Sequence, residues 1–312
     1  MILGRILSSA NMDLTFRPSR GLEVRIVERP GLWMRSRDLE ALIAECRTVA
    51  ATCLGGESLD YGLFGPDKAA RERTIVTLIR DRATGKPIAF NALPLIPVEL
   101  GGERMEVLHL GLVMVDPSAR SGGLSWILYG LTCFLLFFRR QMRPLWVSSV
   151  TQVPAVVGMV AETFDSVWPG QSGTAASFAH RHIARQIMRD HRHAFGVGPG
   201  AGYDDRDSII TDAYTGGSDN LKKSFDVAAP HRDDRYNRFC RERLDYARGD
   251  DLLQIGQIDL RTARRYMMEA VPRGALPKLG VQLLILATQA LIAPTAQWLA
   301  ADRSLGRLRA AR

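Results

Sequence analysis

Val107-Leu-His-Leu-Gly-Leu-Val-Met-Val-Asp-Pro-Ser-Ala-Arg-Ser-Gly-Gly-Leu-Ser-Trp-Ile-Leu-Tyr129 is the stretch of the chain that says most about its architecture. Val107 to Val115 is rich in Val and Leu, as buried strands are, and Asp116-Pro117 ends it because proline has no N–H for the sheet ladder. An apolar helix is expected to begin near Gly122-Gly123. A strand, a glycine turn and a helix in this order point free backbone N–H groups at one place, so the sequence predicts an anion site.

The predicted anion site suits a di- or polyphosphate, because glycines let a phosphate approach the backbone and an arginine supplies a fork of donors. Its expected members are Arg120, Ser121, Gly122, Gly123, Leu124 and Ser125. No Gly-Lys-Ser/Thr follows, which excludes a P-loop, and the Gly-x-Gly-x-x-Gly order of a dinucleotide turn is missing. An ordinary strand-to-helix turn without a ligand is the alternative.

The pattern Arg120-x-x-Gly123-x-Ser125, placed after a buried strand, resembles the acyl-CoA motif of the GNAT (Gcn5-related) N-acyltransferase superfamily, Gln/Arg-x-x-Gly-x-Gly/Ala. Downstream, a helix over 124–140, a strand over 144–150 and a helix opening at Thr151-Gln-Val-Pro-Ala155 are similar to the family's next elements. Upstream, expected strands over 74–80, 87–95 and 95–100 form an antiparallel meander. Their turns are Asp81 to Lys86 and Gly101-Gly102.

The resemblance spans roughly Ile75 to Gly170 and implies an α/β fold: a mixed, mostly antiparallel central sheet flanked by helices, with a helical C-terminal extension. We expect a GNAT-like core over 1–195, a flexible loop or lid over 196–220, and a helical extension over 221–312. The resemblance further implies acyl-CoA, or an acyl carrier protein, as co-substrate, with no permanently bound cofactor. It also implies that the backbone of Val113, Met114 and Val115 holds the pantetheine arm.

The chain departs from the family pattern at three places, two of them in the motif. Gly122 stands where the family usually has Arg or Lys, and Ser125 where it has Gly or Ala. One positive charge is thus missing, and Arg120, a basic residue elsewhere or the backbone must compensate. The tyrosine that many members use as general acid falls near Val160, which cannot donate a proton.

His109 is the expected general base, since an imidazole with a pKa near ~6.5 accepts a proton from an amine close to neutral pH. The resemblance places it near the glutamate base of histone-acetylating members. Strand alternation predicts His109 on one face with Val107, Gly111, Val113 and Val115. A buried structural histidine is the alternative role, and Glu106 is the rival base.

Composition limits the remaining possibilities. The chain has 312 residues, 46% hydrophobic content and a net charge of +8. Four cysteines without metal or disulfide spacing indicate a reducing, cytoplasmic setting, and residues 1–10 do not predict a secretory signal. The pairs His180-x-His182 and His191-x-His193 lie among arginines and favour a basic helix face over a metal site, so we expect no metal. Nucleic acid is not expected as a partner, because no recognition motif accompanies the arginines.

Residues 279–301 carry no formal charge and precede four arginines. Scattered Gln, Thr and Pro favour a helix lying on an anionic membrane, at the cytoplasmic face of the inner membrane, over one that spans it. A buried helix is the alternative. This segment leads us to expect acyl transfer to a long-chain or lipid amine such as a sphingoid base, as in ceramide-type synthesis. A small-amine or peptide acetyltransferase and a non-catalytic acyl-CoA-binding or membrane-scaffold protein stay open.

Overall fold

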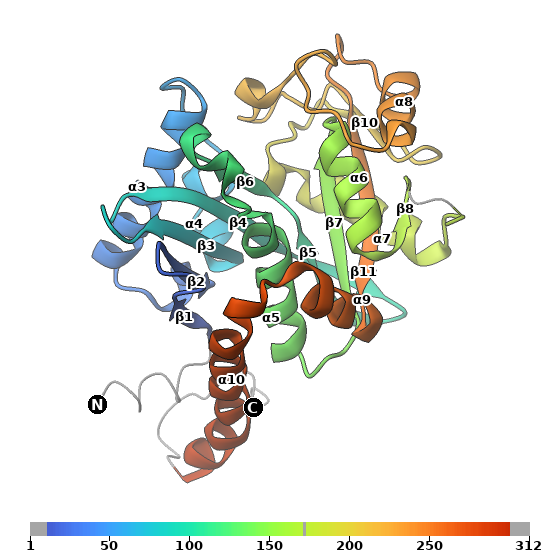
Figure 1. Ribbon diagram of the computed structural model, residues 1–312. Coiled ribbons are helices and arrows are strands. Elements are labelled where there is room, and N and C mark those ends of the chain that lie inside the picture. The colour runs from blue at the N-terminus through green and yellow to red at the C-terminus, as the bar shows by residue number, and fades with distance from the viewer. Residues whose placement is uncertain (1–10, 171–172, 300–312) are drawn as a thin grey trace.

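A mixed α/β fold organises the chain. A computed structural model describes residues 11–170 and 173–299, and at 121–122 and 290–299 it describes the backbone alone. Among the described residues, one open 11-stranded sheet is flanked by helices on both faces (Figure 1). Its order is β1-β2-β3-β4-β5-β7-β11-β10-β9, with β6 paired to β4 and β8 to β11. The pairs are antiparallel apart from β5 with β7, which confirms the expected mixed, mostly antiparallel sheet flanked by helices.

The strands are β1 (Asp13–Phe16), β2 (Leu22–Glu28), β3 (Thr74–Asp81), β4 (Pro87–Leu100), β5 (Glu103–His109), β6 (Leu112–Val115), β7 (Leu145–Thr151), β8 (Asp165–Trp168), β9 (Gly202–Asp204), β10 (Ile209–Thr211) and β11 (Asp251–Ile258). The α-helices are α2 (Pro30–Trp33), α3 (Ser36–Cys53), α4 (Lys68–Glu72), α5 (Thr132–Arg139), α6 (Pro154–Thr163), α7 (Phe178–Gln186), α8 (Asp234–Arg243), α9 (Leu260–Arg265) and α10 (Leu276–Leu299).

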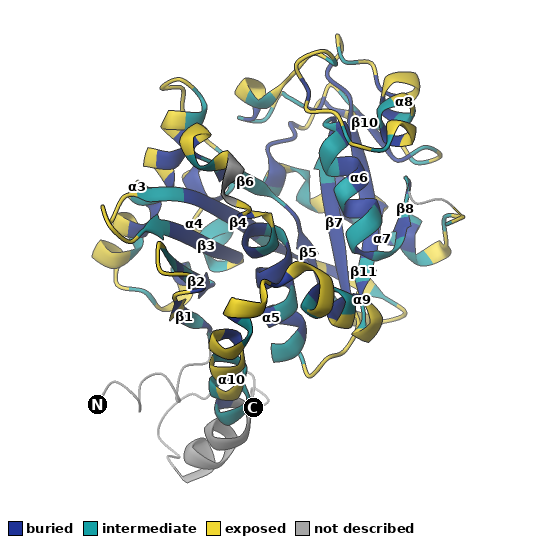
Figure 2. Cartoon of the chain, in the orientation of Figure 1, coloured by how far each residue is buried: buried dark blue, intermediate teal, exposed yellow. Residues whose placement is uncertain are grey.

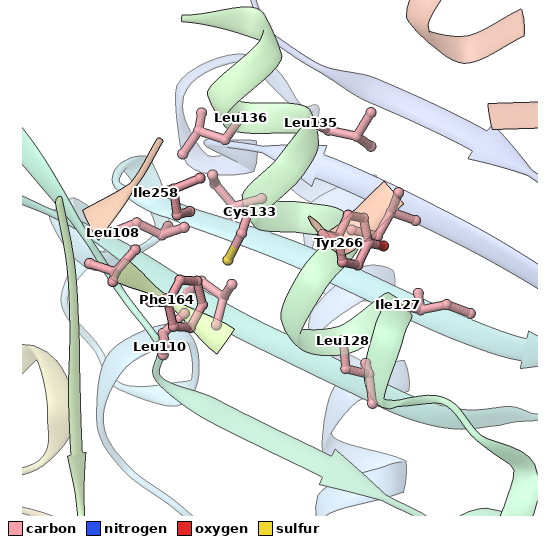
Figure 3. Packing of buried hydrophobic residues seen from close by; sticks show 14 of the residues in the cluster. Leu108, Leu110, Ile127, Leu128, Cys133, Leu135, Leu136, Phe164, Ile258 and Tyr266 are labelled. Carbon is pink, nitrogen blue, oxygen red and sulfur yellow. The ribbon is translucent and has the colours of Figure 1, made fainter. Parts of the chain in front are cut away.

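The two faces of the sheet can be told apart along β4. Its side chains alternate, so Phe90 and Ile96 point toward the cores under α3 and α7, while Leu93 and Leu95 point toward the core under α5. We call these the α3/α7 face and the α5 face. Helix α6 also packs on the α5 face, through Val157 and Val160 among others. Figure 3 shows part of the core on the α5 face.

A β-bulge divides the expected strand 107–115 in two. Leu95 lies opposite Leu108 and Ala92 opposite Leu112, so two residues of β4 face three residues of the other chain segment. Pro94 is one of those two, and it has no N–H to donate across. Gly111 occupies the bulge, where a Cβ would come within 2.7 Å of the Ala92 carbonyl oxygen.

The extra residue shifts the alternation by one position, so the side chains after the bulge point to the opposite face of the sheet from the one that strict alternation predicts. Leu108 and Leu110 lie in the core of the α5 face (Figure 3), and Val113 and Val115 pack against the same core. His109 instead lies on the α3/α7 face, with Val107. The prediction that His109 shares a face with Val113 and Val115 is therefore wrong, because alternation was carried through a position that the bulge shifts.

The sheet opens beyond the bulge. Strand β5 pairs with β7 at Leu108–Val147 and His109–Ser148, and the Leu110 N–H donates to the Ser148 carbonyl oxygen at 2.7 Å. From there β6 stays with β4 while β7 stays with β11, so β6 and β7 diverge (Figure 1). The turn after β6 is a 3-10 helix, Pro117–Gly122, and a π-helical turn, Trp126–Leu131, leads into α5.

The C-terminal third ends in helices, as expected, but the region 221–312 also contributes a strand to the sheet. Strand β11 pairs with β7 from Leu252–Thr151 to Ile258–Leu145 and is buried on both faces (Figure 2). Strands β9 and β10 lie within the region expected as a loop, 196–220, and continue the sheet beside β11. The region after 195 is thus part of the sheet, because Leu252, Leu253 and Ile255 supply apolar surface to both of its faces.

Helix α10 covers most of the apolar segment 279–301 and extends from the body (Figure 1). Leu279 and Leu286 are buried against the core of the α5 face, whereas Val281 is 56% and Leu284 67% exposed. Residues 300–312, with their arginines, lie outside the described part, as does the N-terminal segment 1–10. Among the helices described, none is long and apolar enough to cross a membrane.

Candidate functional site

A cavity of about 740 Å³ lies where β6 and β7 diverge, and residues of both sheet faces line it. From the α5 face it is lined by Val113, Val115, Leu124, Leu128, Tyr129, Ser149 and Thr151. From the α3/α7 face it is lined by Tyr61, His109, Phe195, Tyr214 and Asp251. The cavity therefore passes through the sheet, with the turn after β6 and the start of the helix at one end.

The open edge of β6 forms one wall of the cavity. The Asp116 N–H donates to the Ile88 carbonyl oxygen at 2.8 Å. Since alternate residues bond across an antiparallel pair, the N–H and C=O groups of Val113 and Val115 point away from β4. The Val115 oxygen accepts a hydrogen bond from Cys53 Sγ at 3.3 Å. No described strand pairs with this edge, so its remaining groups can pair with an extended ligand.

The turn and helix start bring the expected anion-binding positions to the same cavity. Gly123 is left-handed, with φ 61°, and the helix proceeds from Leu124, whose carbonyl oxygen accepts from the Ile127 and Leu128 N–H groups. Arg120 is exposed, and it lines the cavity together with Gly123, Leu124 and Ser125. Ser121 and Gly122 belong to the turn, where the structure describes their backbone alone.

Lys223 is a second cation on the cavity wall, and no motif in the sequence pointed to it. It lies about a hundred positions after the motif, so only the fold brings it to this place. It lines the same cavity as Arg120, and its side chain is exposed. Met114, the remaining expected binding residue, lines the cavity and packs into the core under α3.

His109 lies at the point where the strands part. Its Nδ1 is 3.0 Å from Ser148 Oγ, and its ring stacks on Phe195 with 4.7 Å between centroids. The residue is 1% exposed, and burial lowers its pKa to about 3. At neutral pH the imidazole is therefore uncharged, and such a low pKa makes it a weak proton acceptor. A neutral imidazole can still donate a hydrogen bond to an oxygen that gains charge.

Glu106, the rival base, is held elsewhere. Its carboxylate accepts hydrogen bonds from Arg29 Nη2 at 2.5 Å and from Arg140 Nη2 at 2.6 Å. It is not among the residues that line the cavity. This position joins β5 to the segments before α2 and after α5 through charge-assisted hydrogen bonds, which is a structural role.

Asp251 is the buried acid that sequence reasoning missed. It begins β11, is 5% exposed, and accepts a hydrogen bond from the Tyr214 hydroxyl at 2.8 Å. Burial is the main cause that raises its pKa to about 8, and neighbouring Asp250 adds to it. The signal that could have found it is an acidic pair, Asp250-Asp251, directly before an apolar strand.

Tyr129, in the first turns of the helix, lines the cavity from the α5 face. Burial raises the pKa of its hydroxyl to about 12, so the hydroxyl stays protonated.

A smaller cavity of about 240 Å³ adjoins the main one, and Tyr61, Thr74 and Pro94 lie in the walls of both. His191 and His193 line the smaller cavity.

The histidine pairs have local contacts. His180 lies in the capping box that begins α7, where its Nε2 is 2.7 Å from the Ser166 carbonyl oxygen. Within the described ranges, no group of three or more His, Cys, Asp or Glu side chains is placed to hold a metal ion.

Comparison of the sequence with models of known protein families gives no match, and comparison with curated proteins gives no significant match.

Proposed function

We propose that the protein is an acyl-CoA-dependent N-acyltransferase that transfers an acyl group directly from a thioester to an amine. The observation that carries the proposal is the single cavity through the sheet, lined at one end by an anion-binding turn and at the other by buried polar groups. Two substrates can meet inside it without a covalent enzyme intermediate.

The donor half is the end beside β6 and the helix start. The pantetheine arm carries two amides and is extended, so it can pair with the open edge at Val113 and Val115 as an added strand would. The phosphates then meet the N–H groups of the first helical turn, with Arg120 and Lys223 as cations. An acyl carrier protein would present the same arm with a single phosphate.

The transfer needs a neutral amine at the thioester carbon. The amine nitrogen forms the C–N bond, the carbonyl oxygen gains charge, and the C–S bond breaks as the charge returns. The nitrogen loses its extra proton and the thiolate gains one. His109 suits hydrogen-bond donation to the developing oxyanion from Nε2, with Nδ1 turned to Ser148. The general-base role expected for His109 remains testable, although its pKa of about 3 argues against it.

We further propose that the donor or acceptor is a lipid, a sphingoid base being one candidate acceptor, and that the protein binds the cytoplasmic face of an anionic membrane. The support is α10, where Val281 and Leu284 leave apolar surface exposed beside the exposed Lys278. Long side chains of lysine and apolar residues on one helix favour an interfacial position.

The decisive experiment measures thioester consumption. Acetyl- to long-chain acyl-CoA would be tested against amino acids, polyamines and sphingoid bases. We expect turnover with at least one pair, and a weaker affinity for CoA, by about two- to fivefold, in Lys223→Ala because an exposed charge contributes up to ~1 kcal/mol.

Lys68→Ala is the control, since Lys68 is exposed on α4 and lines neither cavity. Stabilisation by CoA without consumption of any thioester would replace the proposed enzyme with an acyl-CoA-binding protein. Turnover limited to acetyl-CoA and small amines would instead favour the acetyltransferase alternative.

A further inference from the structure

Asp251 is a buried acid without a cationic partner. Within the described residues its carboxylate takes part in no ion pair, and the Tyr214 hydroxyl donates its hydrogen bond to Oδ1 rather than to Oδ2. Its neighbour Asp250, by contrast, is held by two hydrogen bonds from Arg248, at 2.7 and 2.8 Å. A buried carboxylate is costly unless it is paired, so Asp251 lacks the positive charge that its neighbour has.

The surroundings of Asp251 in the cavity are aromatic. Tyr214 and Tyr61 line the cavity together with Asp251, and the pKa of each hydroxyl is raised mainly by burial and further by the nearby Asp251. Tyr246 is nearby and donates to the Gln152 carbonyl oxygen at 2.7 Å. Both cavity-lining hydroxyl groups therefore stay protonated and uncharged. Tyrosine faces attract organic cations, and they do so more strongly where water is excluded.

We propose that Asp251, Tyr61 and Tyr214 form a binding site for the positively charged ammonium group of the acceptor substrate. The site rests on the proposed function, because it assigns this half of the cavity to the acceptor. One carboxylate with aromatic neighbours suits an alkylammonium better than a metal ion, which needs several oxygen ligands. No such ligand group occurs among the described residues.

The register places the site away from the thioester. Asp251 precedes Leu252, which pairs with Thr151, whereas His109 pairs with Ser148. These positions are about three to four residues apart along β7, or roughly 10–13 Å at ~3.3 Å per residue. The ammonium group bound by Asp251 is therefore too far from the thioester to react while it is bound there. Either the acceptor first binds at Asp251 and then moves to the thioester, or it carries a second amine that reacts.

Calorimetric titration with n-butylammonium tests the site without turnover, and 1-butanol is the uncharged probe of similar shape. Because the charge of Asp251 attracts the cation only when the carboxyl is ionised, we expect affinity to rise about tenfold from pH 6 to pH 7 and to level off above pH 8. Asp251→Asn should weaken binding at pH 8 by about tenfold or more and remove the pH dependence.

Two further variants separate the site from a folding defect. Glu57→Gln removes an exposed acid from the same cavity wall and should keep the affinity for n-butylammonium within about twofold. Tyr214→Phe keeps the ring but removes the hydrogen bond that lowers the pKa of Asp251, so the pH midpoint of binding should move upward.

The outcomes distinguish the two proposals. Equal binding of 1-butanol and n-butylammonium, or an unchanged midpoint in Tyr214→Phe, would overturn the ammonium site. If thioester turnover persisted in that case, the proposed function would stand alone. Ammonium binding that depends on Asp251, in a protein that consumes no thioester, would support the site and remove the proposed function.

Discussion

His109 and Asp251 show how a cavity wall changes the charge of the groups that it buries. The imidazole, with its pKa at about 3, and the carboxyl, with its pKa at about 8, are both mainly neutral at pH 7 in the ligand-free protein. Desolvation is the main cause in each case, and it acts in opposite directions because it disfavours whichever form is charged. The part of the cavity wall that these two residues form is therefore polar but uncharged at pH 7, and it can admit a long apolar acyl chain.

The low pKa of His109 predicts a dependence of stability on pH. Between about pH 3 and 6.5 the unfolded chain binds a proton at this position and the folded protein does not. The free energy of unfolding therefore rises with pH in this range, and the contribution of His109 to stability is lost as the pH falls toward 3. The slope from this group is at most about 1.4 kcal/mol per pH unit. Urea unfolding at pH 4, 5.5 and 7 should show a shallower slope in His109→Phe than in the unaltered protein.

Ser148→Ala is the matched control, because it removes the partner of Nδ1 and leaves the imidazole buried against Phe195. We expect it to keep the slope. An identical slope in His109→Phe would mean that the imidazole is not desolvated.

At the scale of elements, the bulge at Gly111 shifts the alternation of side chains between β5 and β6. As a result, His109 lies on the α3/α7 face while Val113 and Val115 lie on the α5 face. Gly111→Ala puts a Cβ within 2.7 Å of the Ala92 oxygen and 3.0 Å of Pro94 Cδ, so the backbone must shift. We expect a loss of about 1–3 kcal/mol in the free energy of unfolding, as for other overpacked sites. CoA should also bind more weakly, since Val113 moves with the bulge.

Gly21→Ala provides the comparison, because a Cβ at Gly21 meets no atom within 4 Å. Denaturant unfolding and CoA titration of both variants measure the difference. Equal stability of the two variants would show that the bulge relaxes freely.

The central strands and helices could be expected from the sequence, whereas the bulge between β5 and β6 could not. Alternating Val and Leu before Asp116-Pro117 predict a strand, and Pro154 marks the start of α6, as expected. The bulge depends on Pro94, which lies opposite Gly111 only after β4 has paired, so no local pattern announces it. Strand β11 was missed because its buried run is short and contains Gln254 and Gly256.

The site was partly predictable, because some of its residues are adjacent in sequence and others come together only in the fold. Residues of the turn are adjacent in sequence, so the anion-binding motif could be proposed from one segment. Lys223, Tyr214 and Asp251 reach the cavity from separate parts of the chain. Their placement depends on β10 and β11 joining the sheet beside β7, which is a long-range result of burial.

For the whole molecule, α10 is one of the elements that leave large apolar side chains exposed. Val281→Glu with Leu284→Glu should reduce binding to anionic phosphatidylglycerol vesicles by about tenfold or more, because burying such a side chain contributes ~1.5–3 kcal/mol. Sedimentation with vesicles measures the bound fraction, and phosphatidylcholine vesicles report the contribution of lipid charge.

Val227→Glu tests whether any exposed apolar residue has this effect, since Val227 is 70% exposed but lies outside α10. We expect vesicle binding to be unchanged in this variant. No binding of the unaltered protein to either vesicle would remove the membrane proposal and leave α10 as a packing helix.

The bulge also bears on how such a protein could diversify. Substitutions at Val107 or His109 alter the α3/α7 face of the sheet, and substitutions at Val113 or Val115 alter the α5 face beside the open edge. In the proposed enzyme these are the acceptor and the donor sides. One inserted residue therefore separates a single stretch of chain into two sets of positions, and selection can change the choice of one substrate while preserving that of the other.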